Sequence, residues 1–452
     1  MVYGILKIIT HLSLKVFFRK IEVHGEDLIP EGAPLIIAAN HPSTMIDPIV
    51  IGSAINKRLH YIARGNLFTT TFRRWLLRNL YVIPIYRRGE SSDAMERNED
   101  VFRKCFDVLA GRGSILIFPE GVSQPERRIQ KIKTGTARIA LGAEKANNFK
   151  LGVVIVPVGL NYSEPGEFRS DLFISFAKSI DVSEFLKMYA DSEEAAVKAL
   201  TDHIKKSLEK HTVDIENEAL DKLISDIETI YKDRLTVELD LSPELGGADF
   251  RLTKAITDSV HYFNNKEPER VEALRQKMED YMQLLLSLSL KDELFKKDSV
   301  DRIISLRSFL TAVYSLLGLP IYIYGLMNNY LPYKLPGFIA RKVTNRLEYQ
   351  ASIKLVVGII TFSTFYSAQI WAVATISSVE WMIAYGLMLP ASGFFVLFYW
   401  NRLKLLHGNF LLISLFYRRR VLISRLVQKR SEIVRILEVA KKDYLQQQQE
   451  SK

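Results

Sequence analysis

Short apolar runs alternate with helical patterns along residues 21–181, and this alternation predicts how that part of the chain folds. The short runs are rich in Val, Ile and Leu, whereas the segments between them place apolar residues at helical spacing. We expect strands at Leu35–Ala39, Leu59–Ala63, Tyr81–Tyr86, Ser114–Phe118, Val153–Val158 and Leu172–Phe176. We expect helices at about Met45–Ile55, Leu67–Leu80, Asp93–Gly111 and Thr134–Ala146. Strands that alternate with helices predict an α/β domain with a mixed, mostly buried sheet flanked by helices.

The pattern changes after this domain. Residues 182–305 are rich in Glu, Asp, Lys and Leu and show few strand signals, so we expect a helical region there. Three long apolar stretches follow, at about Phe309–Met327, Leu355–Ile376 and Trp381–Trp400. A helix needs about 20 apolar residues to cross a bilayer core, and the last two stretches have that length without an interior charge. We therefore expect an integral membrane protein with its membrane segments in residues 306–400, the alternative being buried core helices.

Basic residues in the loops predict how these segments are oriented. They lie before the first stretch, between the first and the second, and after the third: Lys296, Lys297, Arg302, Arg307, Lys334, Arg341, Lys342, Arg346, Lys354, Arg402, Lys404, Arg418, Arg419 and Arg420. The turn Ser377–Glu380 has none. By the positive-inside rule the basic loops face the cytoplasm, so the last two stretches should cross as a hairpin. The first stretch should not cross, and Gly318 and Pro320 near its middle predict a re-entrant or in-plane hairpin, with a third span as the alternative.

Both ends of the chain are basic. Residues 1–20 place Lys7, Lys15, Arg19 and Lys20 among apolar positions, which predicts a cationic amphipathic helix at the membrane interface, or else an ordinary helix packed on the core. The whole chain has 61 Lys and Arg against 51 Asp and Glu, a net charge of +10, and residues 401–452 contribute 12 basic and 4 acidic residues to these totals. We expect residues 401–452 to form a basic, helical cytoplasmic tail.

Candidate chemistry begins where the first good strand ends. Leu35–Ala39 continues into NHPSTMIDP, which contains His41 and Asp47. A His directly after a buried strand can pair with a nearby carboxylate, which leaves its other ring nitrogen free to take a proton from a hydroxyl. Taken alone, His41 could equally be a packed or capping residue, and Asp47 before Pro48 a plain turn residue.

Three more segments with polar or distinctive residues follow predicted strands. They are YVIPIYRR at Tyr81–Arg88, FPEGVS at Phe118–Ser123 and VIVPVGL at Val154–Leu160. Ligand sites of α/β sheets lie where strands end, so these segments and His41 should converge at one edge of the sheet. Lys133, in KTGTA, follows the second of them and lies within reach of the same edge.

With these four blocks in this order, residues 30–180 resemble the glycerolipid acyltransferase family, of the lysophosphatidate and glycerol-3-phosphate acyltransferase type. The resemblance implies the acyltransferase fold and a glycerolipid O-acyltransferase. It implies that His41 is the general base and that Asp47 fixes its tautomer and stabilises the imidazolium. In the acceptor site it implies that Arg87 contacts the phosphate, with Arg88 as the second candidate, and that Lys133 is a further cation. It also implies that Glu120 and Gly121 shape this site.

One departure from the family pattern bears on the acceptor. The commonest family spacing has four residues between the His and the Asp, whereas Pro42 to Ile46 make five here, an extra residue that the turn at Pro42 can absorb. The His-Pro form resembles the glycerol-3-phosphate/dihydroxyacetone-phosphate acyltransferase branch, which tends to carry C-terminal membrane segments. We therefore expect glycerol 3-phosphate or dihydroxyacetone phosphate as acceptor in phospholipid biosynthesis, with lysophosphatidate as the alternative.

The expected mechanism needs no cofactor. The thioester donor, acyl-CoA or acyl-ACP, is a co-substrate, and a hydroxyl attacks it directly because Ser123 is not in a nucleophile-elbow pattern. The single Cys105 excludes an intramolecular disulfide and a multi-cysteine metal site, and the eight His residues lack the spacing of metal ligands. We expect a lipid bilayer as partner and the α/β domain on its cytoplasmic face. Nucleic acid is not an expected partner, and the sequence indicates no oligomeric state.

Two other classes of function compete with this interpretation. A hydrolase could use His41 and Asp47 with water, but it would have no use for Arg87 and Lys133. A membrane scaffold or transporter with an inactive acyltransferase-like domain would explain the apolar stretches. It would not explain the four blocks, and the stretches lack the interior charge that marks a polar pathway.

Overall fold

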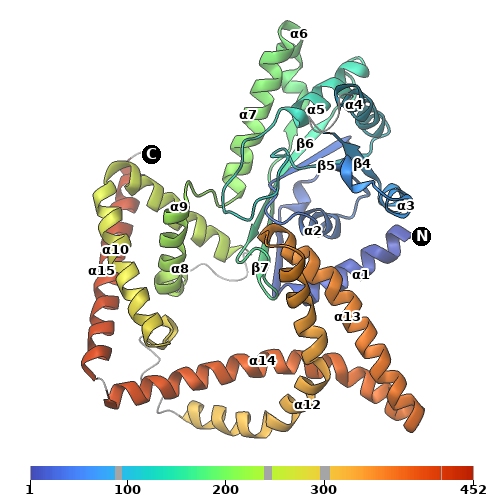
Figure 1. Cartoon of the computed structure of the whole chain (residues 1–452). Coiled ribbons are helices and arrows are strands. Elements are labelled where there is room, and N and C mark those ends of the chain that lie inside the picture. Colours follow the sequence, from blue (N-terminus) through green and yellow to red (C-terminus); the bar gives the residue numbers. More distant parts are fainter. Residues whose placement is uncertain (1, 87–93, 239–246, 296–305, 419, 451–452) are drawn as a thin grey trace. The chain divides into compact units, whose positions relative to one another are not determined.

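The structure is a computed structural model that describes residues 2–86, 94–238, 247–295, 306–418 and 420–450 (Figure 1). These residues form two compact units. The first consists of Met1–Asp214, Pro243–Phe250 and Ile339–Val356, and the second of Ile215–Ser242, Arg251–Phe338 and Val357–Lys452. Each is described by itself below.

The first unit is built on an eight-stranded sheet with the order β1-β7-β6-β2-β5-β3-β4, in which β8 also pairs with β6. The strands are β1 (Lys20–His24), β2 (Leu35–Ala39), β3 (Leu59–Arg64), β4 (Val82–Ile85), β5 (Ser114–Ile117), β6 (Val154–Tyr162), β7 (Asp171–Phe176) and β8 (Ile180–Asp181). The pairings of β6 with β7 and β8 are antiparallel and the others are parallel. The predicted mixed sheet is thus confirmed, with all six expected strands present. The prediction missed β1 and β8, because KIEVH has only two apolar residues and β8 is only two residues long.

Helices cover this sheet on both sides. They are α1 (Val2–Phe17), α2 (Ile46–Ala54), α3 (Thr71–Asn79), α4 (Ala94–Ala110), α5 (Gly135–Ala146), α6 (Leu186–Asp191) and α7 (Glu193–His211), with 3₁₀ turns at Glu26–Leu28, Gly65–Leu67 and Val182–Phe185. Every residue of β2 is buried, as expected for a central strand with both faces covered. The helices predicted between the strands are therefore present, with boundaries shifted by a few residues.

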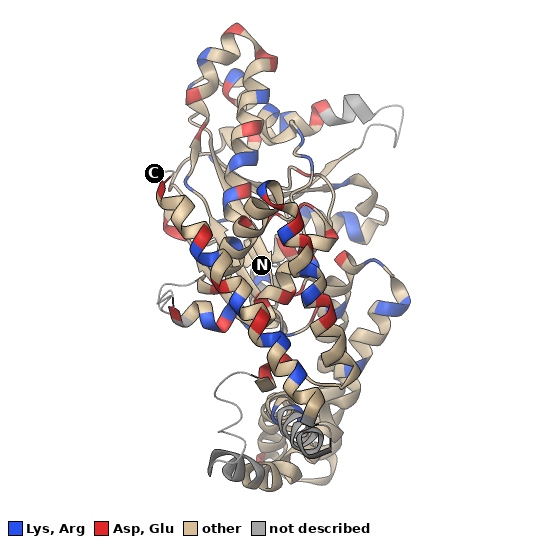
Figure 2. Ribbon diagram, turned by 90° about the vertical axis from the view of Figure 1, so that its left-hand side faces the viewer, with Lys and Arg blue, Asp and Glu red and all other residues tan. Residues whose placement is uncertain are grey.

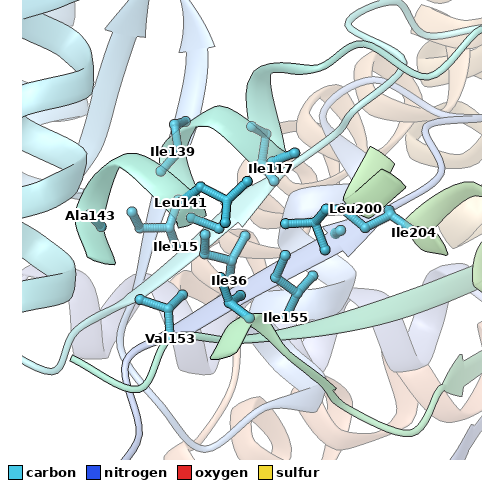
Figure 3. Packing of buried hydrophobic residues seen from close by; sticks show 14 of the residues in the cluster. Ile36, Ile115, Ile117, Ile139, Leu141, Ala143, Val153, Ile155, Leu200 and Ile204 are labelled. Atoms are coloured by element: carbon cyan, nitrogen blue, oxygen red, sulfur yellow. The ribbon is translucent and has the colours of Figure 1, made fainter. Parts of the chain in front are cut away.

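A core cluster of buried apolar residues lies between the sheet and helices α4, α5 and α7. Figure 3 shows strand residues such as Ile36, Ile115 and Ile155 packed against helix residues such as Leu141 and Leu200. Side chains of a strand alternate between its faces, so Leu35 and Ile37 of β2, which are also buried, point to the opposite face. A buried sheet of this kind fixes the ends of its parallel strands, and the loops that follow them, at one edge.

The second unit is helical. Its elements are α8 (Glu218–Glu238), α9 (Ala248–Lys266), α10 (Pro268–Ser287), a 3₁₀ turn (Asp292–Phe295), α12 (Leu306–Val343), α13 (Leu347–Ile376), α14 (Val379–Arg418) and α15 (Arg420–Glu450). The first residues of α9 and α13 and the last residues of α12 lie in the first unit. Asp292, which is buried, accepts hydrogen bonds from Tyr281 (2.6 Å) and Arg430 (2.8 Å) and so joins α10 to α15.

Two helices among the described residues are long and apolar enough to cross a membrane, Leu347–Ile376 and Val379–Lys404. They contain the second and third apolar stretches of the sequence. Figure 2 shows Lys, Arg, Asp and Glu spread over many of the other helices. Length and composition therefore agree with the predicted association with a membrane.

The expected hairpin in Phe309–Met327 is wrong, because α12 continues as one helix through Gly318 and Pro320. A side chain of α14 packs against this part of α12. The Tyr399 hydroxyl of α14 donates a hydrogen bond to the Ser315 carbonyl, close to Pro320. Gly318 lets the Tyr399 ring approach, since a Cβ there would lie 2.8 Å from it.

The two later prolines of α12 are accommodated by side chains of α13. A proline has no N–H, so the carbonyl four residues earlier loses its helical donor. For Pro332 that carbonyl is Asn328, and Gln369 donates to it at 3.1 Å. For Pro336 it is the carbonyl of Pro332, and Thr361 donates to it at 3.1 Å. The partner helix thus supplies the missing hydrogen bonds, as polar side chains do around prolines in membrane helices.

Candidate active site

The structure brings His41 and Asp47 together at the carboxyl end of β2. Asp47 lies in the first turn of α2, and its Oδ2 atom lies 2.8 Å from Nδ1 of His41. The Asp47 side chain is fully buried and that of His41 is 18% exposed. A buried carboxylate beside a partly exposed imidazole is the arrangement that a general base requires.

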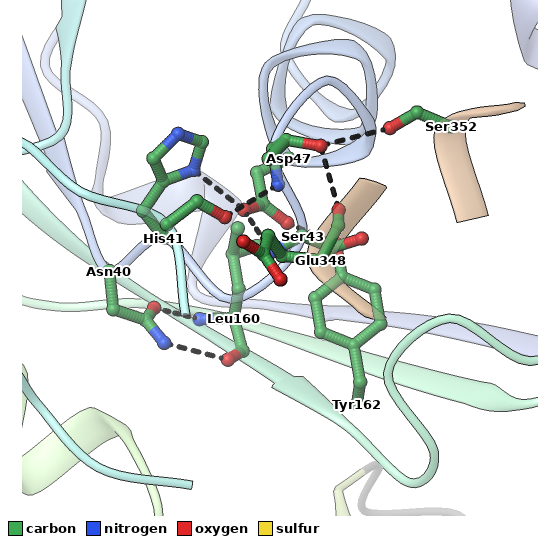
Figure 4. A network of polar contacts seen from close by, with 10 residues as sticks. Asn40, His41, Ser43, Asp47, Leu160, Tyr162, Glu348 and Ser352 are labelled. Atoms are coloured by element: carbon green, nitrogen blue, oxygen red, sulfur yellow. Dashed lines mark hydrogen bonds and ion pairs between the residues drawn. The ribbon is translucent and has the colours of Figure 1, made fainter. Parts of the chain in front are cut away.

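Two further donors satisfy the Asp47 carboxylate. The backbone N–H of Ser43 donates to Oδ2 at 2.7 Å, and the Tyr162 hydroxyl donates to Oδ1 at 2.6 Å (Figure 4). Burial, and secondarily the charge of Asp47, raise the pKa of Tyr162 well above its usual value, so its hydroxyl stays a donor. Tyr162 was missed by the sequence analysis, and the only signal was a polar aromatic residue at the end of an apolar strand, β6.

Asn40 connects the end of β2 to β6. Its side-chain amide donates to the Leu160 carbonyl at 3.0 Å and accepts from the Leu160 N–H at 2.7 Å, as a backbone partner would (Figure 4). The backbone groups of Leu160 are therefore paired although the main chain leaves the sheet at His41. Asn40 was also missed as a positioning residue, although it immediately precedes the His in the motif.

The His41 ring is held in one orientation. It stacks on Phe118, which follows β5, with ring centroids 3.9 Å apart and an angle of 14° between the planes. The His41 carbonyl accepts a hydrogen bond from the N–H of Gln124 at 3.1 Å. With Nδ1 bonded to Asp47, the other ring nitrogen, Nε2, points away from the carboxylate (Figure 4). Nε2 is therefore the atom placed to exchange a proton with a substrate.

The loop between His41 and Asp47 turns at Thr44. Thr44 has a φ of 22°, a left-handed conformation that is unfavourable for a β-branched residue. Its N–H donates to Ser123 Oγ at 2.8 Å. The loop therefore turns sharply enough for the N–H of Ser43 and the ring of His41 to reach the same carboxylate.

Glu120 lies beside this pair and is 3% exposed. Its carboxyl group accepts hydrogen bonds from the backbone N–H groups of His41 and Gln130. Burial first, and then the charge of Asp47, raise the pKa of Glu120 to about 8. Glu120 therefore holds the backbone of His41, a contact that the sequence analysis did not foresee for a residue expected to shape the acceptor site.

Of the other predicted site residues, the structure describes Gly121 and Lys133 but not Arg87 and Arg88. Gly121 has a φ of 65°, and a Cβ there would lie 2.6 Å from Nζ of Lys133. The Lys133 amine thus lies against the turn that follows β5, at the same edge of the sheet as His41. Arg87 and Arg88 lie outside the described residues, after β4.

Cys105 is buried in the core cluster, and burial raises the pKa of its thiol to about 12, which makes it unsuitable as a nucleophile.

Comparison with known proteins finds matches over the part of the chain that contains this pair. Residues 20–161 match the model of the Acyltransferase family, so this part of the chain is an acyltransferase domain. The matched segment contains His41, Asp47 and Glu120 and ends one residue before Tyr162.

Individual relatives match over similar parts of the chain. The glycerol-3-phosphate O-acyltransferase 2 of Saccharomyces cerevisiae is 28% identical over 244 residues, 53% of this chain and 32% of the relative. The 1-acyl-sn-glycerol-3-phosphate acyltransferase of Streptococcus pneumoniae is 28% identical over 172 residues, 36% of this chain and 57% of the relative. The chain thus spans about a third of the yeast protein and just over half of the bacterial one. The crystal structure of the 1-acyl-sn-glycerophosphate acyltransferase of Thermotoga maritima aligns with a TM-score of 0.33 and 22% identity, over 45% of this chain and 79% of that chain.

Glu120 predicts a pH dependence of stability. Its pKa is raised from 4.5 to about 8, so between these values the folded protein binds more protons than the unfolded chain. The free energy of unfolding should therefore fall as the pH rises from about 5 to about 8, by on the order of a few kcal/mol. Glu120→Gln keeps an oxygen acceptor and does not titrate, so it should remove most of this fall.

Thermal unfolding of both proteins in detergent, across this pH range, measures the difference. The comparison cancels the contribution of the His residues, which both proteins share. Parallel pH profiles would show that Glu120 is ionised in the folded protein throughout the range.

Proposed function

We propose that this chain is a membrane-bound O-acyltransferase that transfers a fatty acyl group from an acyl thioester to glycerol 3-phosphate or dihydroxyacetone phosphate. Such a reaction serves phospholipid biosynthesis. The observation that carries the proposal is the His41–Asp47 pair at 2.8 Å, with the carboxylate buried and Nε2 directed away from it. The acyltransferase domain and the name of the yeast relative support the class of reaction and of acceptor.

The proposed reaction is a direct transfer. Nε2 of His41 takes the proton of the acceptor hydroxyl as its oxygen attacks the thioester carbonyl, and Asp47 stabilises the resulting imidazolium. The tetrahedral intermediate then collapses, the carbon–sulfur bond breaks, and the thiolate leaves and takes up the proton. A positioned base of this kind contributes about a hundred- to ten-thousandfold to a rate.

The phosphate of the acceptor requires cations at the same edge of the sheet. Lys133 lies against the turn after β5, and Arg87 follows β4, with Arg88 the second candidate. Arginine can bind a phosphate with two parallel hydrogen bonds, which also fixes its orientation. Lysophosphatidate carries the same phosphate, and the name of the bacterial relative makes it the second candidate acceptor.

A direct assay tests the acceptor. The purified full-length chain in detergent is given a labelled acyl thioester, as the coenzyme A or the acyl carrier protein conjugate. Glycerol 3-phosphate, dihydroxyacetone phosphate and lysophosphatidate are supplied in parallel. Faster acylation of lysophosphatidate than of the two smaller acceptors would replace the first proposal with the second.

His41→Ala and Asp47→Ala should each lower the rate of acyl transfer by about a hundredfold or more, because a hydroxyl is a poor nucleophile without a positioned base. Initial rates at saturating donor and acceptor measure this, with circular dichroism to show that the variants are folded. A His41→Ala protein with the turnover of the wild type would exclude the proposed mechanism.

Arg87→Ala and Lys133→Ala should each lower kcat/KM for the acceptor by about ten- to a hundredfold, because each removes a charge-assisted hydrogen bond. KM for the acyl donor should change little. Arg87→Lys should recover only part of the loss, because lysine lacks the planar pair of donors. An equal loss for donor and acceptor would indicate that Arg87 has a structural role.

The proposal includes a membrane topology. The α13–α14 pair would cross the bilayer as a hairpin, with the acyltransferase domain on the cytoplasmic face, as the positive-inside rule predicts from the basic loops. Helix α1 would lie in the interface, because Ile8, Leu12 and Val16 are exposed while Leu14 and Phe17 are buried. This orientation gives His41 access to soluble acceptors and thioester donors.

Single cysteines test this topology in a Cys105→Ala background. A cysteine at Arg341 should react with a membrane-impermeant thiol reagent only from the cytoplasmic side, and one at Ser378, in the turn between α13 and α14, only from the opposite side. Oriented, sealed vesicles measure both. Labelling of the two positions from the same side would exclude the hairpin.

A further inference from the structure

The first turns of α13 contact the loop between His41 and Asp47. The Thr44 hydroxyl in this loop donates to the Glu348 carbonyl at 2.7 Å and lies 3.2 Å from the Ser352 hydroxyl. Because Thr44 gives its proton to Glu348, the Ser352 hydroxyl must be the donor to Thr44. Figure 4 shows Glu348 and Ser352 reaching this loop from the start of the helix.

A second contact holds the same part of α13. The Lys354 amine donates to the Gly166 carbonyl at 2.8 Å and pairs with Glu167 at 3.0 Å, and its side chain is only 11% exposed. On the same turns, Ala351 and Leu355 are buried. The stretch Ile339–Val356 accordingly belongs to the compact unit that contains the sheet, although α13 continues to Ile376.

The residue of the loop that contacts α13 is Thr44, whose backbone conformation is unfavourable for a threonine. Thr44 holds a left-handed backbone conformation that costs a threonine free energy, and it does so only if its surroundings fix it. Its N–H is bonded to Ser123 and its hydroxyl to α13, so it is held on two sides. The next residue toward the N-terminus, Ser43, donates its N–H to Asp47. Movement of Thr44 would therefore move a donor of the Asp47 carboxylate.

We propose that the first turns of α13, Leu347–Leu355, are part of the catalytic apparatus, with Thr44 and Ser352 as positioning residues. They hold the loop in the conformation that keeps Asp47 bonded to His41. Because the apolar part of α13 is continuous with these turns, the helix that would enter the membrane also completes the active site. The expected effect of these residues on the rate rests on the proposed function, whereas their expected effect on the conformation of the loop does not.

Four variants of the full-length chain test the proposal. Thr44→Val removes the hydroxyl and keeps the shape, Thr44→Ser keeps the hydroxyl, and Thr44→Gly relieves the backbone conformation but loses the contact. Ser352→Ala removes one donor. Ser367→Ala, at an exposed serine further along α13, is the matched control.

We expect Thr44→Val and Thr44→Gly to lower kcat by about tenfold or more, with KM for donor and acceptor within about twofold of the wild type. Thr44→Ser and Ser367→Ala should retain the wild-type kcat, and Ser352→Ala should fall between. If Thr44 had a role in stability alone, Thr44→Gly would instead have a kcat equal to or higher than that of the wild type, because glycine adopts this φ without strain. Wild-type kcat in Thr44→Gly would overturn the proposal.

Hydrogen exchange keeps the test independent of the enzymatic assay. Amide exchange in a peptide that covers residues 42–47 should be faster in Thr44→Val and Ser352→Ala than in Ser367→Ala, whether or not any acceptor is acylated. Unchanged exchange would overturn the proposal. A wild type that acylates none of the three acceptors, with faster exchange in these variants, would refute the proposed function and support the inference about the loop.

Discussion

The site depends on keeping the carboxylate of Asp47 out of water. A buried carboxylate is costly unless its oxygens are bonded, and here donors come from His41, the Ser43 backbone and Tyr162. These three groups lie on the end of β2, on the loop that follows and on β6. The carboxylate is therefore satisfied only when the loop and both strands are in place, which ties the geometry of the base to the fold of the domain.

The sheet determines where those donors lie. In the parallel pairing of β2 and β6, Ala39 is opposite Val158, so β6 extends past the end of β2 and carries Tyr162 to the level of Asp47. Asn40 completes the pairing with Leu160 through its side chain. A shift of one residue in this register would turn Tyr162 to the other face of the sheet and remove a donor from the carboxylate.

A second buried carboxyl group, that of Glu120, lies beside Asp47. Glu120 is buried near Asp47, and its raised pKa of about 8 means that it holds a proton at neutral pH. A neutral Glu120 still accepts hydrogen bonds from backbone N–H groups, and it does not add a second negative charge beside the base. A neutral Glu120 would thus add no repulsive charge toward the phosphate of the proposed acceptor, and Lys133 lies at the same edge.

Periodicity and motif order in the sequence were enough to predict the α/β domain, its six main strands, the two apolar helices and the residues at the strand ends. These features are local, because burial on both faces and strand-end motifs leave a pattern in neighbouring residues. The contacts of Tyr162, Asn40, Glu120 and Ser352 left no such pattern, since each partner is far away along the chain. The break expected at Pro320 does not occur, because α12 continues through it as one helix. Local rules count the hydrogen bonds that a proline removes, whereas only the tertiary structure shows that side chains of α13 replace them at Pro332 and Pro336 of this helix.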